Sequence, residues 1–309
     1  RRLLVENEVT VIKKWVSRFW LNRSYILSQA CKYTGSVFTL WGLISIFNPL
    51  DDCFVDELTF GCKLLIGILV VIIVYLISAI IALIICFHSN KEIVFSSNSK
   101  HSVYVHFGDI FSPDVMGEDC NQRYNLVVPV NRCFDTIVDD NLISHRSLHG
   151  RLMQNMYDSN VFTVEELNQR MQEVLPQCNL ESTLTEAQKP EGNLKRYTAG
   201  TVAEVKKSND LTYFFLGLSK LDNNLQASTT KSEYAVAIQR LIEFCNARSQ
   251  GYPVVMPVIG TGLSRTNIEI CSTIKYLISA LRINKEIINC DFHIVVWKGD
   301  KDKVSIKDL

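Results

Sequence analysis

The chain has 309 residues, 47% of them hydrophobic, and its 32 basic and 32 acidic side chains cancel. A net charge of zero gives no general attraction to nucleic acid, which argues against a nucleic-acid-binding protein. The ten cysteines include no Cys-x-x-Cys pair, which argues against a zinc ribbon or a thioredoxin-like site. Because the sequence begins with Arg1, we expect a natural start upstream.

Residues 3–21 carry apolar side chains at steps of three and four, with basic side chains between them. This spacing is typical of a basic amphipathic helix that lies on a membrane surface. A solvated helix that packs on a folded domain has the same pattern. The sequence leaves both interpretations open.

The run 64–87 contains no charged residue. As a helix it would measure about 36 Å at about 1.5 Å per residue, enough to cross a hydrocarbon layer about 30 Å thick. The run 33–50 is also free of charge and would measure about 27 Å, which is just sufficient. We therefore predict a two-helix transmembrane hairpin within a membrane region at residues 1–90.

Basic residues gather before the first of these helices, whereas the loop between the two helices is acidic. The positive-inside rule then places the N-terminus and the C-terminal region in the cytoplasm. Neither run has an ionisable residue at mid-depth, so a pore would need several copies of the chain.

Residues 91–309 alternate short apolar runs with segments of helical periodicity, which predicts an α/β domain with a mixed sheet between helices. The polar stretch 176–200 is typical of a surface loop. We expect strands at 93–97, 103–107, 126–130, 213–218, 254–259 and 292–297, and helices at 163–174, 231–248 and 266–283.

The strand expected at 254–259 runs into Gly-Thr-Gly-Leu-Ser-Arg at 260–265. Thr266 and Glu269 have the spacing of a capping box, so we expect the next helix to begin at Thr266. A glycine turn before a helix N-terminus exposes backbone N–H groups that suit a phosphate. An ordinary turn has the same short pattern, and the motif is neither a P-loop nor GxGxxG.

Two further strands end in polar residues. The first ends in Gly108-Asp109-Ile110, where the carboxylate can accept a hydrogen bond from an exocyclic amine such as that of adenine. The other ends at Asn131, whose amide suits a sugar hydroxyl. A turn aspartate is the alternative interpretation for Asp109.

The segment that follows Asn131 adds further candidates. Phe134 could stack on a ring, and His149 opens the next helical segment, where we favour a ligand contact or a cap over catalysis. The remaining polar candidates in this segment are Asp135, Thr136, Asp139 and Asp140.

Three of these motifs occur in the order of a macro domain. GDIF at 108–111 resembles the Gly-Asp motif at an early strand end, VVPVN at 127–131 the strand with the ribose-binding Asn, and IGTGLS at 259–264 the phosphate loop. VNRCFDTIVDD, SLHG, AGTVAEV, LSKLDNN and IGTGLSRTNIE more narrowly resemble the divergent macro domain of the ThsA family of Thoeris anti-phage systems. In membrane-type (type II) systems this domain follows two transmembrane helices.

This resemblance implies a ligand derived from ADP-ribose, with no cofactor, metal or catalytic residue assigned. Asp109, beside Ile110, would hold the adenine amine, and Asn131 would contact the distal ribose. The diphosphate would lie against Gly260, Thr261, Gly262, Leu263 and Ser264, with Arg265 adjacent. The glycine-rich segment of ADP-ribosyl hydrolases is replaced here by residues 134–140, so we do not expect an enzyme. Asp139 and Asp140 could instead recognise an amino-bearing group of the ligand.

The resemblance further implies a signal-gated effector in the bacterial inner membrane. A partner TIR-domain enzyme would convert NAD into a histidine–ADP-ribose conjugate, and binding of this messenger would drive homo-oligomerisation, membrane disruption and abortive infection. Two alternatives stay open: a membrane-anchored ADP-ribosyl hydrolase, and a scaffold or channel subunit that needs no nucleotide.

Overall fold

The structure is a computed structural model that describes residues 15–47, 59–112, 115–116, 123–260 and 269–309. It separates into two compact units, the first made of Arg1–Asn90 with Lys301–Leu309 and the second of Lys91–Asp300. The chain passes from the first unit to the second after residue 90, where a domain boundary was predicted. It returns to the first unit after residue 300, which was not predicted: residues 301–309 belong to the helical unit and not to the α/β domain.

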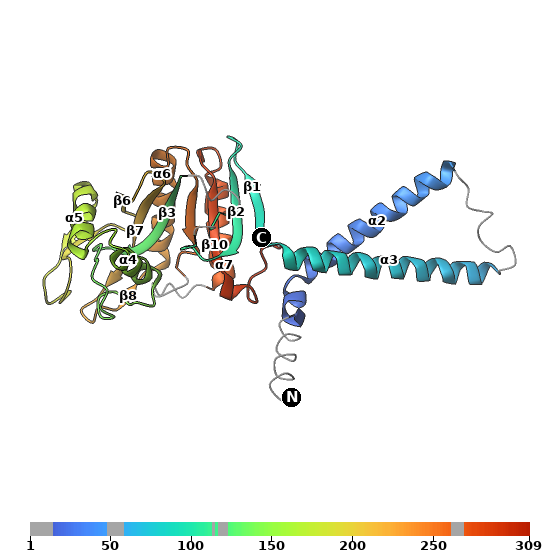
Figure 1. Cartoon of the computed structure of the whole chain (residues 1–309), viewed down its shortest axis with the longest axis horizontal. Helices are drawn as coiled ribbons and strands as arrows, with labels where there is room; N and C mark the ends of the chain where they lie inside the picture. The colour runs from blue at the N-terminus through green and yellow to red at the C-terminus, as the bar shows by residue number, and fades with distance from the viewer. Residues whose placement is uncertain (1–14, 48–58, 113–114, 117–122, 261–268) are drawn as a thin grey trace, which may run out of the picture. The chain divides into compact units, whose positions relative to one another are not determined.

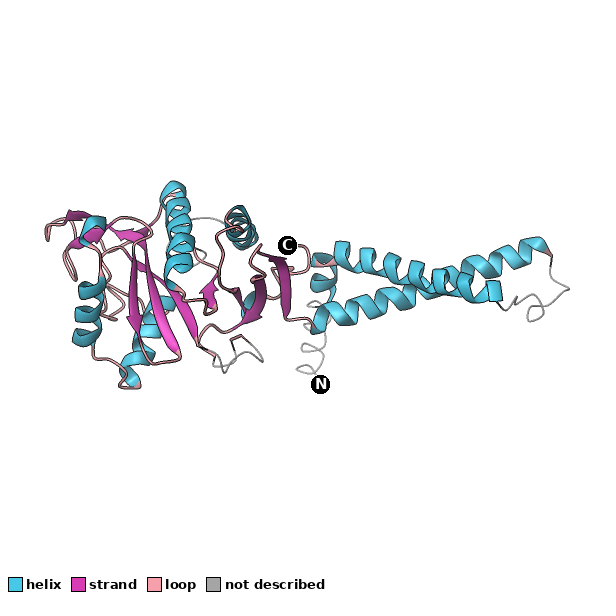
Figure 2. Cartoon of the chain, turned by 90° about the horizontal axis from the view of Figure 1, so that it is seen from above, coloured by secondary structure: helices cyan, strands magenta, loops and turns pink. Residues whose placement is uncertain are grey.

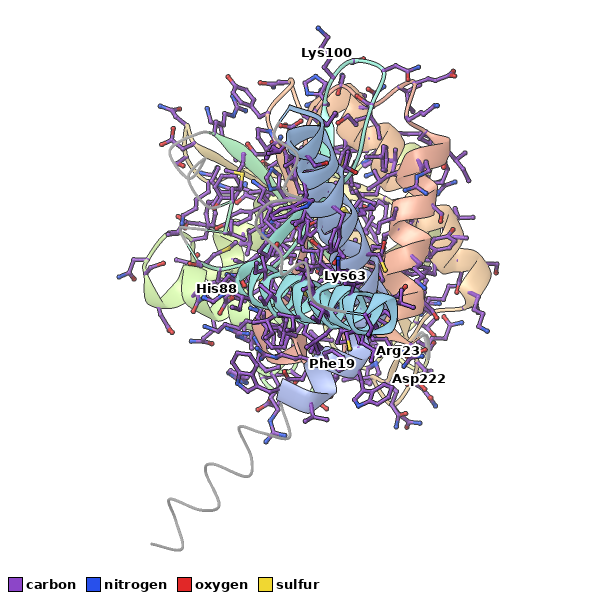
Figure 3. All side chains as sticks on the ribbon, turned by 90° about the vertical axis from the view of Figure 1, so that its right-hand side faces the viewer. Phe19, Arg23, Lys63, His88, Lys100 and Asp222 are labelled. Atoms are coloured by element: carbon purple, nitrogen blue, oxygen red, sulfur yellow. The ribbon has the colours of Figure 1, made fainter. Side chains whose placement is uncertain are left out.

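The helical unit contains α2 (Arg23–Phe47) and α3 (Phe60–His88). The two helices pack at Ile26, Ala82 and Cys86, while most other apolar side chains of α3 are exposed. Figure 3 labels Lys63, in the first turn of α3, and His88, at its end. Over Gly61–His88, α3 is long and apolar enough to cross a membrane. Among the described residues no second helix is both long and apolar enough, so the transmembrane helix predicted at 33–50 stays a prediction. The N-terminal part of the predicted amphipathic helix lies outside the described residues.

The C-terminal segment packs on the helical unit. Val304 and Ile306 are buried, and Asp302 forms an ion pair with Arg18. The Ser305 hydroxyl donates a hydrogen bond to the side chain of Asn22 at 2.7 Å. Apolar burial and these polar contacts together hold residues 301–309 against the start of the helical region.

The α/β unit is built on an eight-stranded mixed sheet, whose path is β1-β2-β10-β9-β3-β7-β6, with β8 beside β7. Figure 1 labels all of these strands except β9. Five neighbouring strands, from β2 to β7, run parallel, whereas β1 and β6 pair antiparallel at the two edges. The carboxyl ends of the five parallel strands therefore meet at one edge of the sheet. The strands are β1 (Lys91–Ser96), β2 (Ser102–Gly108), β3 (Tyr124–Asn131), β6 (Val202–Lys206), β7 (Leu211–Leu221), β8 (Ala227–Ser228), β9 (Val254–Pro257) and β10 (Phe292–Trp297).

Helices cover both faces of this sheet (Figure 2). Tyr213 and Phe215 of β7 pack in one core with α4 (Leu148–Asp158) and α5 (Val164–Val174). Phe214, which points to the opposite face, contacts Phe244 of α6 (Lys231–Arg248), and α6 packs beside α7 (Ile270–Ile283). Burial on both faces explains why β7 reads as an almost continuous apolar run.

Two helices begin at capping boxes. Thr163 and Glu166 start α5, and Thr230 and Glu233 start α6, with side chain and backbone bonded reciprocally in each case. The described part of α7 begins at Ile270, while Thr266, the predicted start, lies outside the described residues.

The stretch 176–200 differs from the predicted surface loop. It contains a 3₁₀ turn (Gln177–Asn179) and a two-stranded sheet of β4 (Leu180–Thr183) and β5 (Lys195–Tyr197). Lys189 is 0% exposed within it. The reason is a long-range ion pair with Asp135, 54 residues away, which local polarity does not reveal.

Candidate functional site

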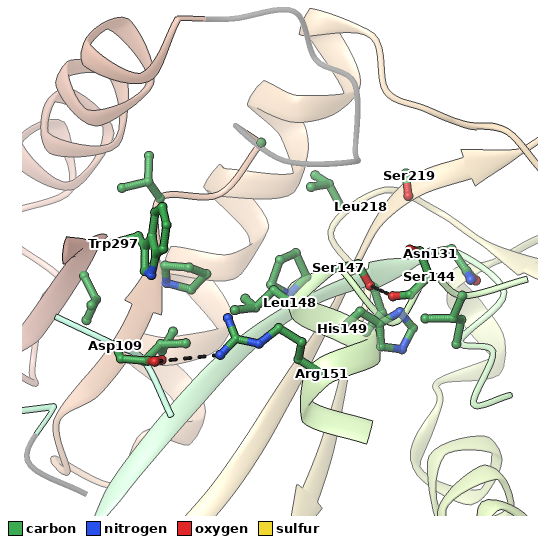
Figure 4. Close-up of a pocket in the computed structure, with 18 of the residues that line it drawn as sticks. Asp109, Asn131, Ser144, Ser147, Leu148, His149, Arg151, Leu218, Ser219 and Trp297 are labelled. Atoms are coloured by element: carbon green, nitrogen blue, oxygen red, sulfur yellow. Dashed lines mark hydrogen bonds and ion pairs between the residues drawn. The ribbon is translucent and has the colours of Figure 1, made fainter. Parts of the chain in front are cut away.

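A cavity of about 300 Å³ lies at the carboxyl edge of the parallel strands. Each strand contributes at its end: Gly108 from β2, Asn131 from β3, Ser219 from β7, Pro257 from β9 and Trp297 from β10. Ligands of open α/β sheets bind in this crevice, because loops and helix N-termini can be arranged there without breaking the sheet. Figure 4 shows labelled side chains in two groups, one around Asp109 and the other around Asn131.

The first group joins the end of β2 to α4. Asp109 accepts a hydrogen bond from the backbone N–H of Phe111 at 3.1 Å. Its second carboxylate oxygen lies 3.7 Å from Arg151, whose guanidinium also covers the Phe111 ring. Trp297 stands at the same end of the cavity and is 55% exposed, so its ring face is accessible for stacking (Figure 4).

The second group centres on Asn131. Its side-chain oxygen accepts from the backbone N–H of Cys133 at 3.0 Å and of Asp135 at 3.5 Å. These bonds orient the amide at the strand end and close the turn that follows. Ser144, Ser147 and His149 line the same part of the cavity (Figure 4).

Local capping holds these three residues in place. Ser147 caps α4 by accepting from the Gly150 N–H at 2.8 Å, and its hydroxyl donates to the Ser144 carbonyl at 2.7 Å. A Cβ on Gly150 would lie 2.2 Å from that same carbonyl oxygen, so the position requires glycine for close approach. Of the two residues at the end of the SLHG motif, His149 lines the cavity, and Gly150 lets the backbone of residues 144–145 come close to α4.

The structure brings together six of the predicted residues: Gly108, Asp109, Ile110, Asn131, His149 and Gly260 all line the cavity. The remainder of the predicted phosphate loop, Thr261 to Arg265, lies outside the described residues, and its role stays a prediction. Gly260 itself has φ +97°, a left-handed conformation that favours glycine and turns the chain away from β9.

Five predicted residues do not line the cavity. Phe134 is completely buried, and its ring packs edge-to-face against Tyr197 and closely over Gly217 in place of offering a stacking surface. Thr136 is buried as well, and its carbonyl accepts from the Tyr157 hydroxyl. The positive φ of Phe134, 54°, turns this segment inward, which the sequence pattern did not show.

Asp135 is also turned inward. Its carboxylate lies 3.1 Å from the Lys189 ammonium and accepts from the Asn193 N–H at 2.6 Å. Burial raises the pKa of the Asp135 carboxyl, and the adjacent ammonium opposes that rise. The pair ties residues 185–193 to the turn after Asn131.

Asp139 and Asp140 fold the loop that supplies Leu142, Ile143 and Ser144 to the cavity. Asp139 accepts from the backbone N–H of Leu142 at 2.7 Å. Asp140 accepts from the His145 N–H at 2.9 Å and pairs with the His145 ring at 3.2 Å. These hydrogen bonds hold the pKa of Asp140 below its usual value. Neither carboxylate lines the cavity, and the expectation that the two recognise a group of the ligand stays a prediction.

Sequence reasoning missed several residues of the cavity wall, which come from elements that meet only in the folded chain. Trp297 could have been found as the aromatic end of a predicted strand, and Arg151 as a cation two positions after His149. Ser147 and Ser219 lie within the SLHG and LSKLDNN motifs, but nothing in the sequence assigned their side chains to the cavity. The missed residues with polar or aromatic side chains are Ser144, Ser147, Arg151, Ser219, Trp297 and Asp300.

A three-layer α/β fold with a cavity at the carboxyl edge of its parallel strands is the usual arrangement of an α/β ligand-binding domain. The family model described as "Thoeris protein ThsA, Macro domain" matches residues 103–297, well over half of the chain. The chain therefore belongs to the ThsA macro-domain family of Thoeris proteins, and the resemblance noted in the sequence is confirmed. The Thoeris protein ThsA of Bacillus amyloliquefaciens (strain Y2) is 25% identical over 183 residues, which are 59% of this chain and 53% of that protein. The chain spans about half the length of this curated relative.

Solved structures with similar folds include a macrodomain of Oceanobacillus iheyensis in its N30A mutant form, 12% identical with a TM-score of 0.40. The comparison covers 72% of this chain and 93% of that one. A protein of Bacteroides thetaiotaomicron is 13% identical with a TM-score of 0.36, covering 62% of this chain and 97% of that one.

Proposed function

We propose that this protein is a membrane-bound anti-phage effector whose α/β unit binds a ligand of the ADP-ribose type. The observation that carries the proposal is the cavity itself. It joins an acceptor carboxylate and an accessible indole at one end to a strand-end asparagine and hydroxyls at the other. Family membership and the apolar helix α3 support the same function.

Each part of the ligand has a counterpart in this arrangement. Asp109 would accept from the adenine amine in place of Arg151, and Trp297 would stack on the base. Gly260, with Thr261 to Arg265, would lie against the diphosphate. Asn131 would bond the distal ribose. The cavity volume of about 300 Å³ is at the lower limit of the usual range for small-molecule sites.

We propose that the ligand is a histidine–ADP-ribose conjugate made from NAD by a partner TIR-domain enzyme. Binding would promote homo-oligomerisation in the bacterial inner membrane. The oligomer would disrupt the membrane, leading to cell death or growth arrest. Ligand can shift assembly only by its difference in affinity for the assembled and unassembled states. Leakage of dye from vesicles that contain the protein, with and without messenger, tests this step.

Binding without turnover is the form we favour over hydrolysis. The carboxylates nearest Asn131 in sequence are occupied elsewhere, Asp135 with Lys189 and Asp139 with the 139–142 turn. Incubation with an ADP-ribose conjugate separates the two functions. Intact ligand supports the binding module, and a split product supports the hydrolase.

A thermal-shift titration of the full chain in detergent tests the binding site. Ligand at 100 times its Kd should stabilise the folded state by about 2.7 kcal/mol. Asp109→Asn should reduce the shift, whereas Asp210→Asn, an exposed change just before the start of β7 at the opposite edge of the sheet, should leave it unchanged. The absence of any shift with ADP-ribose derivatives would contradict the proposal and favour a subunit that needs no nucleotide.

A further inference from the structure

Arg151 brings a positive charge and several hydrogen-bond donors to the wall of the cavity. Among the described lining residues the formally charged side chains are Asp109, Arg151 and Asp300, so Arg151 is the positive one. Its backbone N–H donates to the Ser147 carbonyl at 2.9 Å and so closes the first turn of α4. Leu148, three residues earlier on the same helix, lines the cavity as well. Figure 4 shows the guanidinium directed at Asp109.

The guanidinium is placed beside Asp109 without a close bond to it. One of its terminal nitrogens lies 3.7 Å from the carboxylate, beyond the usual N–H···O distance of about 2.7–3.2 Å. The Phe111 ring, whose centre is 4.9 Å from the guanidinium carbon, supports the group from below by a cation–π contact. The Arg151 side chain is 46% exposed and that of Asp109 29%. An ion pair this long and this exposed contributes little to stability, so a ligand can open it at little cost.

Asp109 and Arg151 have opposite hydrogen-bonding roles. An ionised carboxylate only accepts, whereas a guanidinium only donates, through five N–H groups. Side by side in one wall, the two present an acceptor next to a donor. The edge of adenine is the complement, because its amine donates and the ring nitrogen beside the amine accepts, while guanine has a carbonyl oxygen in the place of the amine. The pair therefore suits adenine and disfavours a base with a 6-oxo group.

Binding of the base changes the partner of Arg151. An adenine amine that donates to Asp109 takes the place of the guanidinium there, and a donor left without an acceptor costs free energy. The shortest move that restores an acceptor, with the Phe111 contact kept, brings the guanidinium to the ring nitrogen next to the amine. A phosphate oxygen is the other acceptor of the ligand, but the proposed diphosphate position begins at Gly260. β10 separates the end of β9, which leads to Gly260, from the end of β2, which leads to Asp109.

We infer that Arg151 is a specificity-determining residue that donates a hydrogen bond to a ring nitrogen of the base, N1 or N7, so that Asp109 and Arg151 together select adenine. The inference rests on the proposed function, in which Asp109 binds the amine. It adds the second polar contact with the base and the reason why adenine is preferred to a 6-oxo base.

The test changes the protein and the base separately. Isothermal titration of the full chain in detergent compares ADP with 1-deaza-ADP and 7-deaza-ADP, which each lack one ring nitrogen, and with inosine diphosphate, in which a 6-oxo group replaces the amine. The variant is Arg151→Met, which keeps an unbranched apolar stem without a donor. The matched control is Arg170→Met, because Arg170 also lies over a phenylalanine ring, 5.1 Å from the centre of Phe162, but does not line the cavity.

We expect Arg151→Met to weaken ADP binding by roughly 10- to 100-fold and Arg170→Met by less than about twofold. On the wild type, one of the two deaza analogues should lose as much affinity as the Arg151→Met variant loses for ADP, and that analogue should lose little more on the variant. Inosine diphosphate should bind the wild type more weakly than ADP does. The wild-type comparison needs no substitution, so it stands even if Arg151→Met fails to fold.

Deaza analogues that both bind the wild type like ADP would overturn the inference, even if Arg151→Met weakens ADP binding, because the arginine would then serve the diphosphate or only the position of Asp109. Losses from the variant and from the analogue that multiply in full, or inosine diphosphate that binds as tightly as ADP, would overturn it too. Binding of ADP-ribose by the wild type with any of these results would leave the proposed function intact. A wild type that binds neither ADP-ribose nor ADP would overturn the proposed function and this inference with it.

Discussion

Replacing Lys189 by methionine should destabilise the α/β unit more than any surface change. The side chain is 0% exposed, and its ammonium donates to Asp135 at 3.1 Å, to the Asn193 carbonyl at 3.0 Å and to the Glu191 carbonyl. Methionine keeps the length and the apolar stem but leaves the Asp135 carboxylate buried without a cation. Breaking a buried pair in this way costs about 3–5 kcal/mol.

The matched control is Lys189→Met combined with Asp135→Asn, which removes both charges. Because the pair is then replaced and not broken, the double variant should recover much of the loss. Urea unfolding of the full chain in detergent, followed by tryptophan fluorescence, gives the free energies of unfolding. The four proteins together form a double-mutant cycle.

The pH dependence of the single variant provides a second check. Without the ammonium, burial should raise the pKa of Asp135 further, so the folded variant holds a proton that the unfolded chain releases above about pH 4. The deficit relative to the wild type should therefore shrink as pH falls from 7 towards 4. A loss below about 1 kcal/mol at pH 7, or a deficit that does not change with pH, would refute the account of this pair.

Three further predictions have defined outcomes. Gly150→Ala should lower the free energy of unfolding by about 1–3 kcal/mol in thermal unfolding, because its Cβ meets the Ser144 carbonyl oxygen at 2.2 Å. Gly108→Ala, with a nearest contact of 3.4 Å, should lower it less, and equal losses would count against the close approach at Gly150. Trp297→Ala should weaken ADP binding by about 1–3 kcal/mol in calorimetry while Trp297→Phe retains most of it, and unchanged binding would remove the stacking role. As pH drops from 6 to 4, the free energy of unfolding in urea should fall by about 1.4 kcal/mol per pH unit for each of three buried histidines, because in this range only the unfolded chain binds their protons. A free energy of unfolding that does not change with pH would show that these histidines are charged in the folded protein. Burial lowers their pKa values to about 4, about 3 and about 3 for His106, His149 and His293.

The central architecture could be predicted because its signals are local. The run over 292–297 forms β10 with the same bounds, and the capping box at Thr230 and Glu233 places the start of α6 where periodicity did. Continuous apolar runs indicate strands buried on both faces, and strand ends in a parallel sheet converge on one edge. For that reason Asp109 and Asn131 could be assigned to one cavity before their distance was known.

What could not be predicted depends on contacts between distant residues. The Lys189–Asp135 pair converts a polar stretch into an ordered part of the fold, and the positive φ of Phe134 turns its ring into the core. Arg151 and Trp297 reach the cavity from α4 and β10. The attachment of residues 301–309 to the helical unit has the same origin, since Asp302 meets Arg18 across nearly the whole chain.

The central claim is that the cavity at the carboxyl edge holds an ADP-ribose-type messenger. Its most direct test is mass spectrometry of the small molecules released by heat from the protein, purified from phage-infected cells that also carry the TIR-domain enzyme of its Thoeris system. The account predicts a released compound whose fragments include an ADP-ribose unit, at a level well above that from folded Asn131→Ala protein. Folded wild-type protein that releases no such compound, or an Asn131→Ala variant that releases equal amounts, would contradict it.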